Sequence, residues 1–287
     1  MRVSDYHPIA FCNILYKLIS KVLANRLKKI LHYVISESQS AFQSSKAITY
    51  NILVAFQTLH HMKAQKSKKI GFMAMKLDMS MAYDCVEWEY LVRIMEKTGF
   101  CEKWVTLVLE CISTVSYSIL VNREPKGDIK PSRGIRQGDP LSPYLFLLCS
   151  EGLNRMLQQA AANDQIKGFS LCKRGPRTSH LFFANNRLLF CRASRTDLQV
   201  IQNIQVLYEN ALGQKLNREK TSIFFCKAVS KETKANLPAF LGVQEVKEYE
   251  KCLGLPAIVG KNKKASFNYI KERVWSKLQG WKEKLLS

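Results

Sequence analysis

Two apolar segments, residues 179–184 and 187–192, are separated only by Asn185 and Asn186. Each segment has the length of a strand, and a two-residue connection is typical of a tight β-hairpin. Asn tolerates the positive φ that such a turn requires. The pattern therefore predicts an antiparallel hairpin with Asn185-Asn186 as its type I′ turn, and any fold of this chain must place that hairpin in an antiparallel sheet.

Helical and strand patterns alternate along the rest of the chain without a regular βαβ order. We expect strands near residues 71–78, 115–121, 166–172 and 222–226, and helices near residues 11–31, 48–66, 88–97, 102–113, 142–162, 197–212 and 266–286. Alternating apolar residues make 115–121 a half-buried strand. These elements predict an α+β fold in which helices cover one face of an antiparallel sheet.

Two helices carry more detailed expectations. The first has an apolar stripe at helical spacing and basic residues on its polar side; the stripe consists of Phe11, Leu15, Leu18, Val22, Leu27, Ile30 and Leu31. The helix at 142–162 is expected to start with Ser142 as its N-cap and Pro143 at its first helical position.

The charge is strongly positive. The chain of 287 residues has 44 Lys and Arg against 23 Asp and Glu, a net charge of +21. Lys and Arg displace condensed counterions from phosphates, so this excess predicts a nucleic-acid partner. A ribosome-like or membrane-surface protein is the alternative that composition leaves open.

Nine cysteines are scattered through the chain without any pair at two-residue spacing, which does not indicate a zinc site. Most lie in apolar runs, as free cysteines do in a reducing compartment. No signal peptide and no apolar stretch of transmembrane length is present. We expect an intracellular protein of the nucleus or cytoplasm that makes no membrane contact.

Asp78 ends the expected strand at 71–78. Nucleotidyl transfer uses metal ions held by Asp residues from neighbouring strands, and a strand ending in Asp beside a hairpin tip is one way to build such a site. Alternatively, Asp78 caps a turn and Asn185-Asn186 is a hairpin turn without chemistry. The residues alone leave both interpretations open.

Seven short motifs stand in a fixed order along nearly the whole chain. They are Pro8-Ile9 and residues 36–42, 78–88, 132–143, 182–186, 213–222 and 253–256. Together they closely resemble successive motifs of the reverse transcriptases of LINE-type (non-long-terminal-repeat) retrotransposons. The resemblance implies a right-hand polymerase core that uses an RNA template, a DNA primer, deoxynucleotides and Mg²⁺.

The resemblance also implies site residues. Asp78 is the implied palm metal ligand, and Asn185 and Asn186 occupy the positions of the family's Asp pair. Tyr83 is implied to lie under the incoming sugar. Residues implied to contact nucleotide or template are Gly134, Arg136, Gln137, Gly138 and Lys220, and the implied primer grip is Leu253, Gly254, Leu255 and Pro256. Each has a plainer interpretation, such as core packing for Tyr83 or a solvated charge for Lys220.

The implied domains are partial, mostly helical fingers at 1–70, a palm with inserted fingers elements at 71–260, and the start of a thumb or connector helix at 261–287. The family's endonuclease region and most of its thumb have no counterpart, so we expect a piece of a longer reading frame. The sequence does not indicate an oligomeric state.

Several positions depart from the family pattern. Both tip acids are Asn, and unusual residues also stand at His7, Tyr50, Met81, Cys85 and 43–46. Such scatter suggests a degenerate copy. We therefore expect impaired Mg²⁺ binding and lost activity. The alternatives are a basic RNA- or DNA-binding module without catalysis and an unexpressed pseudogene product.

Overall fold

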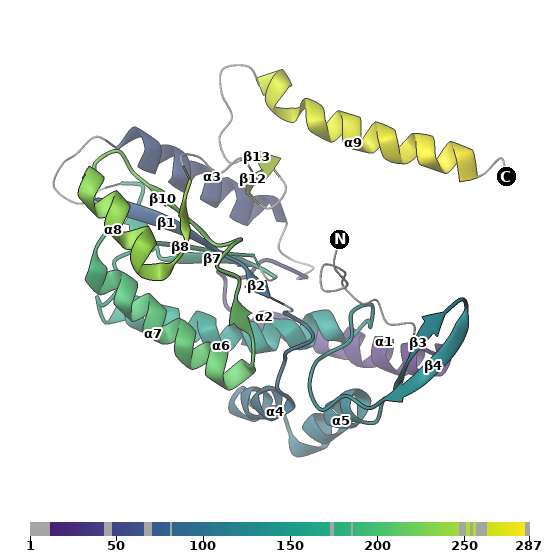
Figure 1. The fold of residues 1–287 in the computed structure, drawn as a ribbon. Helices are drawn as coiled ribbons and strands as arrows, with labels where there is room; N and C mark the ends of the chain where they lie inside the picture. Colours follow the sequence, from purple (N-terminus) through teal and green to yellow (C-terminus); the bar gives the residue numbers. More distant parts are fainter. Residues whose placement is uncertain are drawn as a thin grey trace.

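A computed structural model describes residues 12–42, 48–65, 71–80, 82–172, 175–184, 186–246, 251–252, 255–256 and 263–284. Figure 1 shows its arrangement. Several predicted features therefore lie outside the described residues. They are Asn185, Leu253, Gly254, Met81, His7, the motif Pro8-Ile9 and residues 43–46.

The centre of the fold is a five-stranded sheet in the order β11-β10-β1-β8-β7. Its strands are β1 (Phe72–Leu77), β7 (His180–Phe183), β8 (Asn186–Arg192), β10 (Ser222–Phe225) and β11 (Gln244–Glu245). All pairs are antiparallel except β10 with β11. The predicted antiparallel sheet and its hairpin are thus confirmed, and the short parallel strand β11 is an addition.

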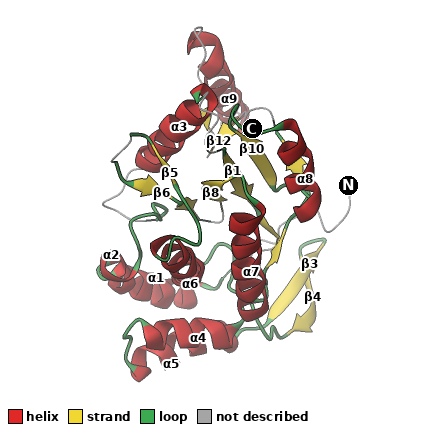
Figure 2. Ribbon diagram, turned by 90° about the vertical axis from the view of Figure 1, so that its left-hand side faces the viewer, coloured by secondary structure: helices red, strands yellow, loops and turns green. Residues whose placement is uncertain are grey.

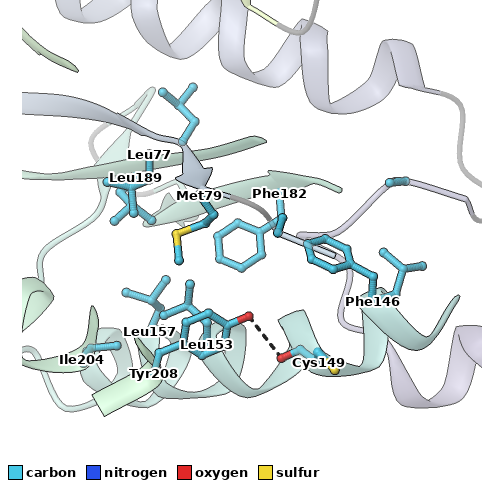
Figure 3. Packing of buried hydrophobic residues seen from close by; sticks show 14 of the residues in the cluster. Leu77, Met79, Phe146, Cys149, Leu153, Leu157, Phe182, Leu189, Ile204 and Tyr208 are labelled. Atoms are coloured by element: carbon cyan, nitrogen blue, oxygen red, sulfur yellow. Dashed lines mark hydrogen bonds between the residues drawn. The ribbon is translucent and has the colours of Figure 1, made fainter. Parts of the chain in front are cut away.

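Two long helices, α6 (Ser142–Ala162) and α7 (Arg195–Leu212), lie together along one side of this sheet (Figures 1 and 2). Figure 3 shows the core between them and the strands, where Met79 and Phe182 approach Leu153 and Tyr208. The helices α4 (Trp88–Lys97) and α5 (Glu102–Ser113) follow one another below, and α4 packs on α6. The confirmed α+β class follows from burying the apolar faces of these helices on the sheet.

The remaining elements are shorter or peripheral. They are α1 (Ile14–Lys28), α2 (Leu31–Val34), α3 (Ile48–Ala64), β2 (Met79–Ser80), β3 (Tyr117–Val121), β4 (Glu124–Ile129), β5 (Phe169–Ser170), β6 (Arg177–Thr178), β9 (Lys215–Leu216), α8 (Lys231–Leu241), β12 (Lys251–Cys252), β13 (Leu255–Pro256) and α9 (Lys263–Lys284). The pattern at 166–172 thus yields only the two-residue strand β5. No described helix has the length and apolar character needed to cross a membrane.

Helix boundaries followed local signals in most places. The structure gives α4 and α5 the predicted bounds, and α7 ends at Gly213, whose φ is +78°. The N-cap prediction for α6 was wrong. Ser142 lies inside the helix, and its Oγ donates to Asp139 Oδ2 at 3.4 Å. The buried carboxylate also accepts from the Leu141 amide at 3.1 Å, so Asp139 satisfies the helix start instead.

The strand predicted as half-buried, β3, is largely exposed. Its residues Ile119 and Leu120 are 59% and 58% exposed. It forms an isolated hairpin with β4, which no second layer of described residues covers. The turn residues Asn122 and Arg123 have φ of +52° and +70°, the combination expected of a type I′ turn. Alternation along β3 described its backbone correctly but could not reveal whether another element would cover it.

The face that α1 buries agrees only in part with the predicted apolar stripe. Leu27 of the stripe is buried, but Leu15 and Leu18 are 74% and 60% exposed, and Leu23 and Ala24 are buried although they lie outside the stripe. The amphipathic pattern predicted the helix correctly, but only part of the side that packs on the protein.

Candidate active site

Asp78 directly follows β1, and Asn186 is the first residue of β8, the strand that pairs with β1. Leu77 of β1 pairs with Arg187 of β8, so Asp78 and Asn186 come next in the antiparallel register. Cα atoms of residues directly opposite in such a ladder are about 4.5–5.5 Å apart. Side chains alternate along a strand, so continuation of the register by one residue predicts that Asp78 and Asn186 share the face opposite to Leu77 and Arg187.

The hairpin tip is shifted by one residue from the prediction. Phe183 pairs with Asn186, so Asn186 belongs to β8 and is not a turn residue. Ala184 has a positive φ of +52°. The expectation that Asn185-Asn186 forms the turn was therefore wrong at Asn186.

Gln39 explains how an alanine can adopt this turn conformation. The amide of Ala184 donates to Gln39 Oε1 at 3.2 Å, and the amide of Ala41 donates to the same oxygen at 3.0 Å. Gln39 is buried, and the Phe182 amide donates to the Ser38 carbonyl at 2.8 Å. A segment of the expected fingers thus supports the tip. Sequence reasoning assigned no role to Gln39, although it lies inside the motif at 36–42.

The turn that contains Lys220 is attached to Asp78 through the backbone. The Asn217 amide donates to the Asp78 carbonyl at 2.9 Å, and the Asp78 amide donates to Thr221 Oγ1 at 3.4 Å. Asn217 Oδ1 accepts from the Lys220 amide at 3.1 Å. Lys220 is exposed at this turn. Lys220 therefore lies in a turn whose backbone is hydrogen-bonded to Asp78.

The turn at 82–88 is joined to the loop at 132–140. The Gly134 amide donates to the Val86 carbonyl at 2.8 Å, and the Ile135 amide donates to the Tyr83 carbonyl at 2.9 Å. Gly134 has φ of +92°, and a Cβ there would lie 2.8 Å from the Asp84 carbonyl oxygen. Only glycine fits such a close backbone approach. The structure thus brings Tyr83 and the Gly134 loop together.

Tyr83 is half-buried and stacks on Phe146 of α6, with ring centroids 4.9 Å apart and an interplanar angle of 9°. Burial raises the pKa of the Tyr83 phenol to about 12, so it is neutral at physiological pH. The contact with Phe146 fixes the ring against the helical layer.

The next residues of the loop differ in their surroundings. Gln137 is half-buried and Gly138 is exposed, with φ of +96°. The side chain of Arg136 packs against α1 and α5. Its Cζ lies 3.8 Å from the centroid of the Tyr16 ring, and its Nη2 donates to the Cys111 carbonyl at 3.0 Å. Sequence reasoning did not identify Tyr16 as part of this region.

The predicted primer grip is described only in part. Residues Leu255 and Pro256 form β13, which pairs with β12 through Lys251↔Pro256 and Cys252↔Leu255. The described backbone is thus a short antiparallel hairpin.

An antiparallel sheet backed by two helices, with Asp78 at the end of β1 and the β7–β8 hairpin next to it, is the arrangement of an α+β polymerase core. The chain belongs to the reverse transcriptase (RNA-dependent DNA polymerase) family, whose model matches residues 2–267.

Relatives specify the branch of this family. An uncharacterized 149 kDa protein of transposon TX1 from Xenopus laevis is 24% identical over 220 residues, covering 77% of this chain and 16% of that protein. The Pol polyprotein of the type-2 retrotransposable element R2DM from Drosophila melanogaster is 26% identical over 222 residues, covering 76% of this chain and 19% of that protein. The chain spans less than a fifth of either relative. The resemblance to non-long-terminal-repeat retrotransposons is confirmed.

Of two further similar proteins, one matches a shorter part of this chain and the other has a lower sequence identity. An uncharacterized mitochondrial protein of Arabidopsis thaliana is 45% identical over 67 residues, which are 23% of this chain and 55% of that protein. A solved structure of telomerase from Candida albicans has a TM-score of 0.48 and 16% identity, covering 76% of this chain and 34% of that one.

Divalent metal ions are general in this family, so the donor atoms near the tip can be compared with what Mg²⁺ requires. Mg²⁺ is a hard cation that prefers anionic oxygens. Asp78 offers one carboxylate and Asn186 offers a neutral amide. Within the described residues, no three His, Cys, Asp or Glu side chains gather into a metal site. Asp78 and Asn186 together thus offer one negative charge to a divalent ion.

Proposed function

We propose that this chain is the fingers-and-palm core of a retrotransposon reverse transcriptase whose chemistry is disabled. Its ancestral activity is DNA synthesis on an RNA template from deoxynucleotides. The observation that supports the proposal is the register of β1 and β8, whose last pair, Leu77↔Arg187, is followed by Asp78 on one strand and preceded by Asn186 on the other. By resemblance, the family has carboxylates at both of these positions. Asn185 is the second replaced acid.

The loss follows from charge. Two amides in place of two carboxylates remove two negative charges from the site that must hold the metal ions. Each lost charge-stabilising group costs several kcal/mol in the transition state, so the rate should fall by at least ~10³-fold. The other proposed contacts are Tyr83 under the sugar, Gln137 and Gly138 at the template and nucleotide, and Lys220 near the triphosphate.

Primer extension with Mg²⁺ tests this proposal. The chain should extend no primer on an RNA template. The matched control is the double variant Asn185→Asp, Asn186→Asp, and extension by this variant alone would assign the loss to the amides. Faint extension with Mn²⁺ is compatible with the proposal, because Mn²⁺ accepts weaker ligands more readily. Robust Mg²⁺-dependent extension by the unaltered chain would overturn it.

A second candidate function is nucleic-acid binding without catalysis, which the net charge of +21 favours. Fluorescence anisotropy with an RNA–DNA hybrid should show little sequence preference and an affinity that falls steeply with salt. An affinity that is the same at low and physiological salt would remove nucleic acid as the reason for the charge.

A further inference from the structure

Tyr16 of α1 contacts the two residues that flank the Gln137-Gly138 segment. Its ring lies under the guanidinium of Arg136, 3.8 Å from Cζ, and its hydroxyl donates to Asp139 Oδ2 at 2.8 Å. Arg136 precedes the segment and Asp139 follows it. One side chain from the fingers, more than a hundred residues away in sequence, therefore holds both flanks of a two-residue segment.

The contacts of Arg136 are directed into the protein. Nη2 donates to the Cys111 carbonyl at 3.0 Å and Nη1 donates to Cys12 Sγ at 3.6 Å. One face of the guanidinium plane is covered by the Tyr16 ring. A phosphate that bound Arg136 would have to compete with these partners. An arginine that binds a polyanion presents the N–H donors of its guanidinium to solvent, and the guanidinium of Arg136 does not.

Asp139 is also committed to internal partners. It is 2% exposed and accepts from the Leu141 amide at 3.1 Å and from Ser142 Oγ at 3.4 Å, besides Tyr16. Burial, followed by the neighbouring Asp139 charge, raises the pKa of the Tyr16 phenol above its ordinary value, so the hydroxyl remains a donor. The pair is thus a charge-assisted hydrogen bond that ties α1 to the start of α6.

We propose that Tyr16, Arg136 and Asp139 form a joint, here called the α1 joint, that positions Gln137 and Gly138, and that Arg136 does not itself contact nucleic acid or nucleotide. The importance of Gln137 and Gly138 for substrate rests on the proposed function. This assignment replaces the expectation that Arg136 binds nucleotide or template. In this assignment α1 and the loop at 134–141 are held together as one unit, and Tyr16 is a positioning residue.

Hydrogen exchange and hybrid binding together test the α1 joint in the full chain. Tyr16→Phe keeps the ring and loses only the bond to Asp139. Because a hydrogen bond to a charged group is lost, exchange of amides in residues 134–141 should rise at least about tenfold. Exchange in β1 and α7 should stay unchanged, which separates a local loosening from general unfolding. Unchanged exchange at 134–141 would overturn the joint.

Arg136→Gln tests the second part. Affinity for an RNA–DNA hybrid should fall while the slope of log K against log salt stays the same, because no phosphate contact is removed. Removal of a side chain that does contact a phosphate lowers this slope by about one. A slope reduced by about one in Arg136→Gln, with exchange at 134–141 as in the unaltered chain, would make Arg136 a phosphate contact and overturn the proposal.

The two proposals fail in different ways. If the unaltered chain shows no salt-dependent binding of the hybrid, the proposed function fails, while the exchange result for Tyr16→Phe still decides the joint. If Arg136→Gln does not fold, Arg136→Lys retains the charge but lacks the planar fork and stacking surface, and it should show the same raised exchange.

Discussion

Leu77 of β1 faces Arg187 of β8 at the last paired position before the candidate catalytic residues. Arg187 is 1% exposed, and its Nη2 donates to the Tyr208 hydroxyl at 3.1 Å. Its Cζ lies 5.0 Å and 5.6 Å from the rings of Tyr208 and Phe182. Its Nε and Nη1 have no hydrogen-bond partner among the described residues. A buried cation with unmade hydrogen bonds is costly, although the aromatic rings offset part of the cost.

Replacing this cation should therefore stabilise the protein. For Arg187→Met we expect the free energy of unfolding to rise by about 1 to 4 kcal/mol, because an unbranched apolar side chain fills similar space without the desolvation penalty. Urea unfolding measures the change. The control Arg93→Met removes an exposed partner of Glu89 and should change stability by less than about 0.5 kcal/mol. A loss of stability in Arg187→Met would show that the aromatic contacts outweigh the buried charge.

The stability of the fold should depend on pH through His180. Burial lowers the pKa of His180 from 6.5 to about 4 in the folded protein. Its Nε2 is hydrogen-bonded to the buried Asn154 side chain, and Ser179 Oγ lies 2.9 Å from its Nδ1. Between pH 6.5 and about 4 the unfolded chain takes up a proton at this position and the folded chain does not. Stability is thus fully present above pH 6.5 and falls as the pH drops to about 4.

The difference between the His180 pKa in the unfolded and folded chains corresponds to about 3 kcal/mol in the free energy of unfolding. Unfolding midpoints in urea across the range would show it. His180→Gln carries no titrating group and should flatten this part of the profile, whereas His60→Gln, at an exposed position, should leave it intact. Equal profiles for the unaltered chain and His180→Gln would refute the assignment.

Gly134 should tolerate no side chain. Gly134→Ala combines an unfavourable φ with a Cβ placed 2.8 Å from the Asp84 carbonyl oxygen. Gly127→Ala is the matched control, since φ is +76° there and nothing lies within 4 Å of the added Cβ. We expect the control to cost about 1 kcal/mol and Gly134→Ala to cost clearly more, on the order of 3 kcal/mol, in thermal unfolding. Equal costs would mean that the loop yields to the methyl group.

Restoring the two acids should restore metal affinity at the tip. In the variant Asn185→Asp, Asn186→Asp, two carboxylates join Asp78, and Mg²⁺ affinity measured by calorimetry should rise at least about tenfold. Asn203→Asp introduces a carboxylate at an exposed position of α7 and serves as the control. If the control raised the affinity as much as the revertant, general charge attraction rather than a rebuilt site would be the cause.

Local patterns in the sequence determined many of the elements. The bounds of α4 and α5, the strand at β1 and the end of α7 at Gly213 follow from periodicity, helix-ending glycine and apolar runs. These signals depend on residues within about one helical turn of each other, so they survive in almost any fold. The ordered motifs likewise identified the family, because they are read directly from the chain.

Tertiary structure decided the features that depend on distant partners. The turn conformation of Ala184 is supported by the hydrogen bond from its amide to Gln39 Oε1. Ser142 is not an N-cap, because its hydroxyl donates to Asp139. Leu15 on α1 and Ile119 on β3 are exposed because no described element covers them. Tyr16 meets Asp139 across 123 positions of sequence. A hydrogen-bonding group bonds to whichever partner the fold brings to it, and no pattern confined to neighbouring residues contains that information.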